Sequence, residues 1–342
     1  MKAARLHDGK TELTVEQVDD PVATPGTVII DVESCFLSPF VAQMVAGEGG
    51  YVMPPRPFTP GMDVIGVISD VADDVDGLKT GTRVYGDPLY YSAGRAGDAD
   101  YGFIGSFGVG PEASRMLAKW RDGGYAEKMR LPAECAVPIP DEVAIKPELM
   151  CRLGWIGTAY GGFLHAGLEP GQDVAIVGAT GVLGTSAVLL ALAMGAGRVY
   201  ALGRRREILD QLAALDDRVI AGTELPEGAA FDVLFSSVEA ADASSIEVLL
   251  PSLRRFGQVA ITAATGQPLP VSLGWLLVNE VSVHGSLWFP RWAGARLVDM
   301  IASGQLDLSK VTATTFSLDD IDRALGETRQ HYGGLNHVAI VV

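Results

Sequence analysis

The stretch from Val174 to Arg206 constrains the fold of this chain more than any other part of the sequence. It begins with an apolar, β-branched run at Val174–Val177, which is typical of a parallel strand buried on both faces. A glycine-rich turn follows, and then an apolar segment, Val182–Met194, predicts a helix buried under a sheet. Val199–Leu202 predicts a second strand. The sequence therefore predicts a βαβ unit whose turn has the composition of a dinucleotide-binding site.

The glycines of this turn permit a tight bend, close approach of the backbone to a pyrophosphate, and close packing of the helix on the strand. The N–H groups of the first helical turn and the positive end of the helix dipole would bind the pyrophosphate. Because glycines also make ordinary tight turns, the order strand, turn, helix, strand carries the argument. The contacts expected here are Gly178, Thr180, Gly181, Val182, Leu183 and Gly184.

The end of the second strand distinguishes the two nicotinamide dinucleotides. An acidic residue there would accept hydrogen bonds from the ribose 2′-OH. Gly203 stands there instead and is followed by Arg204, Arg205 and Arg206. A glycine would leave room for a 2′-phosphate, and guanidinium groups bind phosphate oxygens bidentately. The alternative is a solvated helix start, but the helix dipole disfavours cations there, so the sequence predicts NADP(H) rather than NAD(H).

The overall composition fits a soluble enzyme of two domains. The chain has 342 residues, of which 48% are hydrophobic and 20% charged. Its net charge of −16 argues against nucleic acid or an anionic membrane as partners. The start of the sequence lacks a signal-peptide core and no apolar run is long enough to span a bilayer, so a cytoplasmic location is expected. Three scattered cysteines indicate neither a disulfide framework nor a cysteine-rich metal site.

Residues 1–146 predict a mainly β domain. Val28–Val32 and Val64–Val71 are apolar or alternating runs, and many prolines and glycines punctuate the segment, which is typical of a compact, partly open barrel. Between Asp87 and Gly123 lies a long segment without strong periodicity, as in many functional or association surfaces. One short helix is predicted there, at Pro111–Trp120.

After Arg206 the chain alternates between strands and helical segments, one of them predicted at Ser244–Phe256. The further strands are predicted at Asp217–Ala221, Phe231–Ser236, Gln258–Ala263 and Val281–His284. Together with the first two strands they predict a doubly wound parallel sheet of the α/β class.

The tail does not continue this alternation. It predicts an amphipathic helix at Ala293–Ser303, a second helix from Leu318, and a final strand at His337–Val342. We therefore expect a dinucleotide-binding domain at residues 148–286 and a second domain formed by residues 1–147 and 287–342, with the ligand cleft between them.

With these motifs in view, the chain resembles the medium-chain dehydrogenase/reductase superfamily, which contains the zinc alcohol dehydrogenases and the zinc-free quinone oxidoreductases. In the glycine turn, Ala179 takes the place of the usual first glycine, which implies a slightly different loop. The resemblance implies a Rossmann domain, a GroES-like catalytic domain, and a homodimer formed through the sheet edge near Val281–Phe289. It rests on Gly61-x-Asp63-x-x-Gly66, Gly81-x-Arg83-Val84, Gly123-Gly124-Tyr125-Ala126-Glu127, Thr158-Ala159-Tyr160, Gly171-x-x-Val174, Ser303-Gly304-x-Leu306 and Phe316-x-Leu318-x-Asp320.

The metal ligands of the zinc enzymes are missing at the matching positions. A cysteine, a histidine and a later cysteine fall on Ser38, Met62 and Gly154. A catalytic zinc needs about three ligands of the Cys, His or Asp/Glu type, and Asp63 alone would be one weak ligand. The lobe at residues 87–123, which in those enzymes carries four cysteines for a structural zinc, contains none. We therefore expect neither metal.

Without a Lewis acid, a side chain must supply the proton or hydrogen bond as hydride arrives. Tyr51 matches a tyrosine of the zinc-free quinone oxidoreductases, and a phenol can donate a proton to a developing enolate or alkoxide. An aromatic ring packed at the domain edge is the alternative for Tyr51. Ser38 is a second catalytic candidate, although a serine at a strand end can simply bond backbone. Asp63 is expected to be structural, with Arg83 as its partner.

The resemblance also assigns residues to the nicotinamide end. Thr158 matches a position against the nicotinamide ring, Ser286 lies on the loop that faces the carboxamide, and Ala263 ends the predicted strand before that loop. Aromatic residues near both edges of the expected cleft suggest a small hydrophobic substrate, although each alone is more often core filling. They are Trp155, Trp288, Trp292, Tyr90 and Tyr91.

The sequence thus predicts a zinc-independent, NADP(H)-dependent oxidoreductase. Reduction of a quinone or an α,β-unsaturated carbonyl is the first hypothesis, because the metal ligands are missing and Tyr51 is present. A metal-free interconversion of ketone and alcohol is the second, because the 87–123 lobe is long for a quinone reductase. A protein that binds NADPH without turnover is a minor third.

Overall fold

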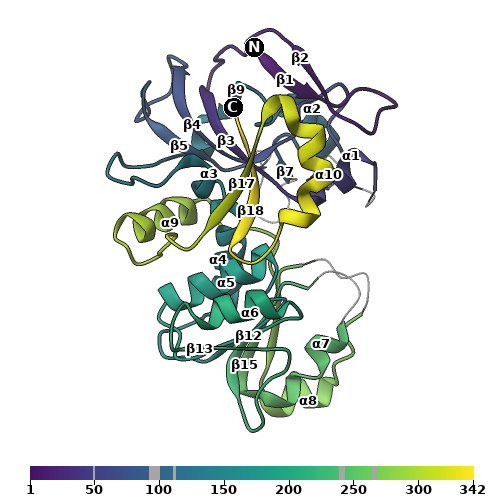
Figure 1. The fold of residues 1–342 in the computed structure, drawn as a ribbon, viewed down its shortest axis with the longest axis vertical. Helices are drawn as coiled ribbons and strands as arrows, with labels where there is room; N and C mark the ends of the chain where they lie inside the picture. Colours follow the sequence, from purple (N-terminus) through teal and green to yellow (C-terminus); the bar gives the residue numbers. More distant parts are fainter. Residues whose placement is uncertain (49–50, 92–100, 111–112, 239–242, 264–267) are drawn as a thin grey trace. The chain divides into compact units, whose positions relative to one another are not determined.

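The computed structural model describes residues 1–48, 51–91, 101–110, 113–238, 243–263 and 268–342. The chain forms two compact units (Figure 1). Unit 1 contains Met1–Gly154, Val311–Tyr332 and Asn336–Val342, and unit 2 contains Trp155–Lys310 and Gly333–Leu335. Among the described residues, no helix is long and apolar enough to cross a membrane.

Unit 1 is built on one mainly antiparallel sheet in the strand order β10-β5-β4-β3-β18-β17, with β9 also paired to β3. Only the pair β17 and β18 runs parallel. The side chains of these strands that point inward, such as Val28, Ile30, Val64 and Leu131, are buried and form the core of the unit. The strands are β3 (Thr27–Leu37), β4 (Met62–Val71), β5 (Arg83–Gly86), β9 (Lys128–Pro132), β10 (Ala136–Pro138), β17 (Thr312–Ser317) and β18 (Asn336–Val341).

Smaller elements complete unit 1. The helices are α1 (Pro39–Val45), α2 (Ala113–Lys119), α3 (Pro147–Met150) and α10 (Ile321–His331), with 3₁₀ turns at Ala133–Cys135 and Leu318–Asp320. The remaining strands form a pair, β1 (Lys2–Arg5) and β2 (Thr14–Gln17), and a three-stranded sheet of β6 (Leu89–Tyr91), β7 (Tyr101–Phe103) and β8 (Gly108–Val109). The helix predicted at Pro111–Trp120 corresponds to α2, and residues 111–112 lie outside the described chain.

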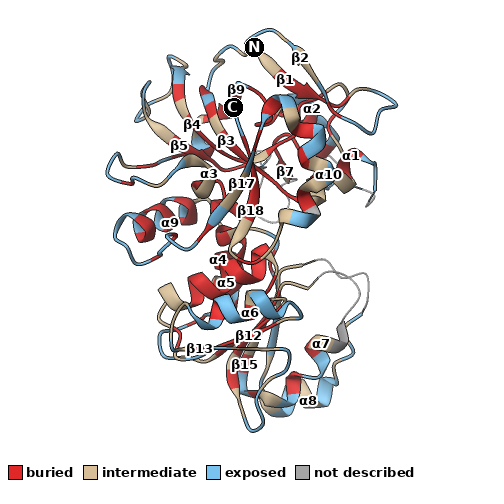
Figure 2. Ribbon diagram, viewed as in Figure 1, coloured by how far each residue is buried: buried red, intermediate tan, exposed pale blue. Residues whose placement is uncertain are grey.

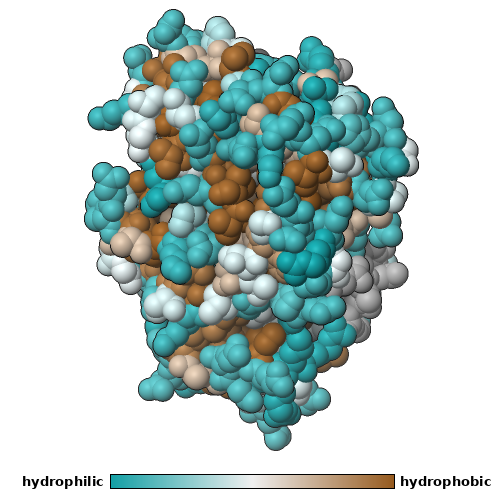
Figure 3. All heavy atoms as spheres, turned by 45° about the horizontal axis from the view of Figure 1, so that its top comes forward, coloured by the Kyte–Doolittle hydropathy of each residue, from teal (hydrophilic) through white to brown (hydrophobic). Residues whose placement is uncertain are grey.

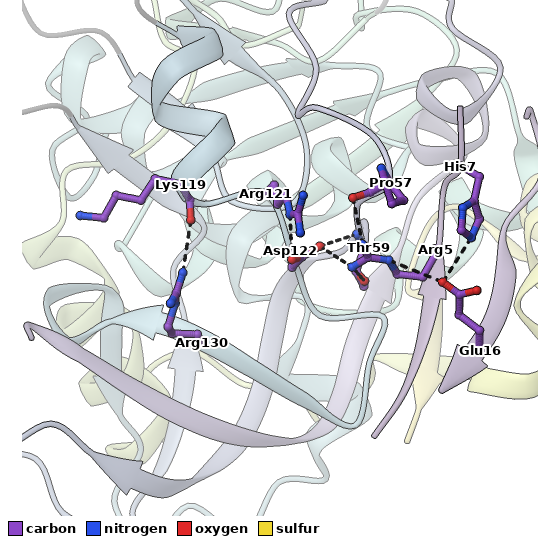
Figure 4. A network of polar contacts seen from close by, with 9 residues as sticks. All are labelled: Arg5, His7, Glu16, Pro57, Thr59, Lys119, Arg121, Asp122 and Arg130. Carbon is purple, nitrogen blue, oxygen red and sulfur yellow. Dashed lines mark hydrogen bonds and ion pairs between the residues drawn. The ribbon is translucent and has the colours of Figure 1, made fainter. Parts of the chain in front are cut away.

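A buried arginine ties three segments of unit 1 together (Figure 4). Arg5 on β1 donates to Asp122 Oδ1 at 2.8 Å and to the Pro57 carbonyl at 2.9 Å. The backbone N–H of Thr59 donates to the same Asp122 oxygen at 2.9 Å. Because Arg5 is only 9% exposed, these contacts replace the water that its guanidinium loses on folding. The network therefore holds β1, the segment before β4 and the turn after α2 in one place.

Unit 2 is a six-stranded, fully parallel sheet in the order β13-β12-β11-β14-β15-β16. The glycine-turn motif consists of β11, α5 and β12. All three elements are buried along nearly their whole length, as Figure 2 shows for α5. The strands are β11 (Val174–Val177), β12 (Val199–Leu202), β13 (Val219–Gly222), β14 (Phe231–Ser236), β15 (Leu253–Ile261) and β16 (Ser282–Gly285). The helices are α4 (Leu153–Ala166, which begins in unit 1), α5 (Val182–Ala193), α6 (Arg206–Ala213), α7 (Ala243–Glu247), α8 (Leu273–Asn279) and α9 (Trp292–Ala302), with a 3₁₀ turn at Leu250–Ser252.

This sheet confirms the predicted doubly wound parallel arrangement, with two local differences. The predicted helix at Ser244–Phe256 is wrong after Glu247, because Pro251 sits in a 3₁₀ turn and β15 begins at Leu253. Helix α8 was not predicted, because its apolar residues are exposed on several sides.

The domain ranges also differ from the expectation. Residues 287–310, which include α9, lie in unit 2 and not with the tail in unit 1. The reason is local contact: Trp292 of α9 packs edge-on against Tyr160 of α4, and the Gln305 side chain donates to the carbonyl of Ala193 at 2.9 Å. Strands β17 and β18 and helix α10 lie in unit 1.

The face drawn in Figure 3 carries many hydrophilic side chains, as the charge of the chain suggests. Figure 3 shows polar side chains over most of the face it draws, with brown apolar patches between them. Apolar atoms contribute to the surface of every folded protein, so scattered patches of this kind need no further explanation.

Candidate functional site

The glycine turn after β11 has the geometry that a bound pyrophosphate requires. Gly178 has a φ of 82°, which glycine adopts without strain. A Cβ on Gly184 would overlap the carbonyl of Gly178, so this glycine allows α5 to pack closely on the turn. By contrast, a Cβ on Gly181 would meet only the Gly178 oxygen, at an ordinary 3.4 Å. Packing within the protein therefore does not require a glycine at position 181. A glycine is expected there if a ligand lies close to the backbone.

Helix α5 starts directly at this turn, with Gly181 as its N-cap. The Thr185 hydroxyl donates to the Ala179 carbonyl at 2.8 Å and fixes the turn to the helix. Val182, Leu183 and Gly184 make up the first turn of the helix. The positive end of the helix dipole at this turn fits the pyrophosphate of a dinucleotide.

Gly203, at the end of β12, lies against the glycine turn. A Cβ on Gly203 would lie 2.5 Å from Thr180 Cγ2 and 3.0 Å from Thr180 Oγ1. The Thr180 side chain therefore takes the space that a side chain at position 203 would need, and the expected role of Gly203 toward a 2′-phosphate stays a prediction. The sequence could not show this contact, because the two residues meet only through the fold.

The three arginines that follow are not equivalent. Arg205 donates through Nη2 to the Thr180 carbonyl, which also accepts the backbone N–H of Gly334 at 3.0 Å. Burial, and the neighbouring charge of Arg204, lower the pKa of Arg205 from its ordinary value. All three arginines are exposed. Among the contacts of the described residues, it is the Arg205 guanidinium that meets the glycine turn.

The residues predicted for the nicotinamide end also lie in unit 2. Thr158 is buried on α4, and Ser286 is buried directly after β16. Ser286 Oγ would lie 3.1 Å from a Cβ on Gly161 of α4, and it has no hydrogen-bond partner within the described part of the chain. A buried hydroxyl without a partner is costly, and a carboxamide would satisfy it. Ala263 follows β15 and is half-buried.

The positions that hold zinc in the alcohol dehydrogenases come together in unit 1. The register of β3 and β4 pairs Phe36 with Met62, and Ser38 follows β3 as the N-cap of α1. A Cβ on Gly154 would overlap the Asp63 carboxylate, so this position adjoins β4 as well. A hydroxyl, a thioether and a glycine do not fit a catalytic zinc. Across the described residues, no group of three or more His, Cys, Asp or Glu side chains is placed to hold a metal ion.

Asp63 is the ionisable group at the centre of this region. It is 2% exposed and accepts a hydrogen bond from the Tyr85 hydroxyl at 2.8 Å. Burial raises the pKa of the Asp63 carboxyl to about 7, with a smaller contribution from the charge of Asp87, while the Tyr85 bond lowers it. The predicted pairing with Arg83 is wrong, because Arg83 forms a two-pronged ion pair with Glu33 at 2.8 Å.

Tyr51 lies in an aromatic cluster, which fits the packing alternative, and its catalytic role stays a prediction. Its ring packs against Phe40 at 5.3 Å and against Phe107 at 4.9 Å between centroids. Phe40 is the second residue of α1, so Tyr51 and the N-cap Ser38 belong to one region of unit 1. Tyr51 is 39% exposed. Ser38 is buried and makes no side-chain capping bond.

The residues predicted for the aromatic pocket wall belong to both units. In unit 1, Tyr90 packs on Trp120 and Tyr91 on Tyr101. In unit 2, Trp288 stacks on Phe289, and Trp292 is 59% exposed beside Tyr160. Trp155 is half-buried on α4. The aromatic residues around Tyr51 are Phe40 and Phe107. No pattern in the sequence singles them out, because aromatic residues usually fill cores.

Comparison with known proteins agrees with this geometry. Residues 24–141 match the alcohol dehydrogenase GroES-like domain family. An alcohol dehydrogenase of Geobacillus stearothermophilus is 30% identical over 294 residues, which cover 84% of this chain and 85% of that protein. The acryloyl-coenzyme A reductase of Metallosphaera sedula is 26% identical over 331 residues, covering 94% and 95%. The crystal structure of a thermostable alcohol dehydrogenase from Pyrobaculum aerophilum has a TM-score of 0.81 at 26% identity and covers 100% and 99%.

A β-rich unit and a parallel sheet with a glycine turn at a helix N-terminus define an oxidoreductase of the GroES-like and Rossmann type, which confirms the predicted fold class. The chain belongs to the medium-chain alcohol dehydrogenase family.

Proposed function

We propose that this protein is a zinc-independent, NADP(H)-dependent oxidoreductase that transfers hydride to the polarised double bond of a quinone or an α,β-unsaturated carbonyl. The observation that carries the proposal is the replacement of all three zinc positions. Ser38, Met62 and Gly154 lie together in unit 1, and the space at position 154 is taken by the Asp63 carboxylate. No metal-based polarisation of the substrate is therefore part of the proposal.

The cofactor proposal rests on the two ends of the nucleotide site in unit 2. At the pyrophosphate end, α5 begins directly at the glycine turn, so the positive end of its dipole faces that site. At the adenosine end, Arg205 offers a guanidinium that faces the glycine turn and no carboxylate stands in the position that would recognise a 2′-OH. NADP(H) would supply the hydride, and the residues of the chain orient it.

The substrate proposal rests on Tyr51 and its surroundings. The Phe40 and Phe107 rings fix the orientation of Tyr51 and give it an apolar environment that fits a small hydrophobic substrate. A phenol can donate a proton to the enolate or quinol oxygen that forms as hydride arrives at carbon. The likeness to an acryloyl-coenzyme A reductase, whose name describes reduction of a conjugated C=C bond, supports this choice.

Metal-free interconversion of a ketone and an alcohol is the second candidate. The relatives named alcohol dehydrogenase favour it, as does the segment at residues 87–123, part of which forms the sheet β6-β7-β8 in unit 1. In that reaction Tyr51 or Ser38 would bond the carbonyl oxygen directly. Binding of NADPH without turnover is a minor third candidate.

We also propose that the protein is a homodimer formed through β16. This strand is the last in the order of the parallel sheet, so one of its edges has backbone groups available for a second copy. Val283 on β16 and Leu287 just after it are 43% and 46% exposed, which fits an apolar contact between two copies.

A panel of NADPH and NADH assays tests the function. Quinones, enones, saturated ketones and cyclic imines are each offered with either cofactor, and the metal content of the purified protein is measured by mass spectrometry. We expect NADPH-dependent turnover of quinones or enones by metal-free protein, unchanged by a chelator. Activity confined to saturated ketones would favour the second candidate, and NADPH binding without any oxidation would favour the third. Stoichiometric zinc with loss of activity on chelation would refute the proposal.

A further inference from the structure

A short segment far along the sequence lies on the adenosine end of the nucleotide site. Gly333–Leu335, between α10 and β18, belongs to unit 2, whereas the residues on either side of it belong to unit 1. The N–H of Gly334 donates to the Thr180 carbonyl in the glycine turn at 3.0 Å. A Cβ on Gly334 would lie 2.9 Å from Ile208 Cγ2 of α6, so the segment packs on this helix as well.

Gly333 lies directly against the guanidinium of Arg205. A Cβ at position 333 would overlap the Cζ and both Nη atoms of Arg205. Gly333 also has a φ of 137°, a conformation that only glycine adopts readily. Both the backbone conformation and the space around it therefore require glycine at this position.

Arg205 is exposed, but its guanidinium contacts the chain on two sides. The Thr180 carbonyl accepts from Nη2, and the Gly333 backbone covers the guanidinium. A free arginine side chain loses rotamer entropy when a ligand fixes it. A guanidinium that the protein already holds in place avoids part of this loss when it binds an anion. The guanidinium of the neighbouring Arg204 repels that of Arg205 at the start of the helix. A bound anion would reduce this repulsion.

We propose that Gly333 is a specificity-determining residue, which sets the preference for the 2′-phosphorylated cofactor by holding the Arg205 guanidinium against the Thr180 carbonyl. This inference rests on the proposed NADP(H) dependence and adds a positioning residue to it. Gly333 acts through Arg205 and does not contact the phosphate.

Two nucleotide fragments test the proposal without any turnover. Adenosine 2′,5′-bisphosphate carries the 2′-phosphate and 5′-AMP lacks it, so the ratio of their dissociation constants reports recognition of that phosphate alone. Calorimetric titration of the full-length protein gives both constants. For Gly333→Ala we expect the affinity for the bisphosphate to fall about tenfold while that for 5′-AMP stays within about twofold, because one hydrogen-bonded charge contact is weakened.

Two controls separate this role from a structural one. Gly304→Ala places a side chain at another positive φ in unit 2, 74°, where nothing lies within 4 Å, and it should leave the ratio unchanged. In the Arg205→Ala background the ratio is already lost, and Gly333→Ala should then cost nothing further. Equal losses for both fragments, or an additional loss in the Arg205→Ala background, would overturn the inference.

A conservative variant keeps the test valid if Gly333→Ala does not fold. Arg205→Lys retains the charge but loses the planar fork, so it should remove most of the preference, whereas Arg296→Lys on the exposed face of α9 should keep it. Unchanged preference in Arg205→Lys contradicts the inference. If the wild-type protein binds both fragments equally, the NADP(H) proposal itself fails. If it prefers the bisphosphate and Gly333→Ala keeps that preference, only the role of Gly333 is refuted.

Discussion

The carboxylate of Asp63 occupies the space that a side chain at position 154 would need. In the zinc alcohol dehydrogenases the matching position carries a metal ligand, whereas in this chain it is a glycine at the start of α4. Asp63 and Gly154 therefore act as a matched pair: the carboxylate can be buried here because the glycine has no side chain. Restoring a ligand at position 154 requires the removal of Asp63.

Gly154→Ala should destabilise the protein by about 1–3 kcal/mol, because the new methyl group overlaps a buried carboxylate that packing prevents from moving. Gly326→Ala is the matched control, since Gly326 is also in a helix but has nothing within 4 Å of its Cβ position. The control should gain roughly 0.5–1 kcal/mol from the better helix propensity of alanine. Urea denaturation of both variants measures the difference. Equal effects of the two substitutions would show that Asp63 leaves position 154 free.

Asp63 should also make the stability depend on pH. Its pKa rises from 3.8 in the unfolded chain to about 7 in the folded one, so the folded protein keeps a proton that the unfolded chain has lost. The stability due to that proton is complete below about pH 4 and is lost as the pH rises through about 7. Between pH 5 and pH 8 the free energy of unfolding should therefore fall by about 3 kcal/mol from this group.

Asp63→Asn should remove this fall, because the amide stays neutral and can still accept the Tyr85 hydroxyl, and because asparagine tolerates the φ of 59° at this position. Denaturation midpoints at pH 5 and pH 8 measure it. Asp73→Asn, at an exposed site of the same unit, should keep the wild-type dependence. A variant Asp63→Asn with the full pH dependence would show that the carboxyl is ionised throughout this range.

The parts of the fold that local patterns specify were predictable. The strand at Val174–Val177, its glycine turn and α5 follow from an apolar run and glycine spacing, both of which act within one βαβ unit. The predicted helix through Phe256 failed because Pro251 outweighed an otherwise helical pattern.

The contacts that define the site were less predictable, because they join residues far apart in the chain. Thr180 fills the space beside Gly203, and the Asp63 carboxylate fills that beside Gly154, yet no spacing in the sequence links either pair. Arg83 pairs with Glu33 and not with Asp63, because the register of β3, β4 and β5 decides which side chains meet. In these cases the residue types indicated which positions matter, but only the folded structure shows which residues contact each other.

The Thr180–Gly203 contact predicts how the cofactor preference can be changed. An aspartate at position 203 would accept hydrogen bonds from a ribose 2′-OH, but its Cβ would overlap the Thr180 side chain. Gly203→Asp alone should therefore weaken the binding of both NADPH and NADH by about tenfold through misplacement of the turn. The double variant Gly203→Asp with Thr180→Ala should regain NADH binding and not NADPH binding. Fluorescence titration of both cofactors measures this, and a single variant that already prefers NADH would contradict the steric argument.

Tyr51→Phe should lower the turnover number by about 10²-fold, since proton donation by a positioned side chain contributes roughly that much or more. Cofactor affinity should not change, because phenylalanine keeps the ring and removes only the hydroxyl that the proposal assigns to the substrate oxygen. Tyr101→Phe, a tyrosine in the three-stranded sheet of the same unit, should keep full turnover. Stopped-flow measurement of NADPH oxidation with an enone substrate compares the three proteins. Unchanged turnover in Tyr51→Phe would remove Tyr51 from the mechanism and leave Ser38 as the candidate donor.

The last prediction concerns the oligomeric state of the protein and rests on the edge strand β16. If a second copy extends the sheet at this edge, Val283 is buried in the dimer, and Val283→Lys places two charges in an apolar contact close to the symmetry axis. The variant should elute as a monomer in size-exclusion chromatography with light scattering, whereas the wild type should have the mass of a dimer. Val248→Lys is the control, because Val248 is 75% exposed in the same unit but lies outside β16. A dimer that persists in Val283→Lys, or a monomeric wild type, would place the interface elsewhere or exclude it.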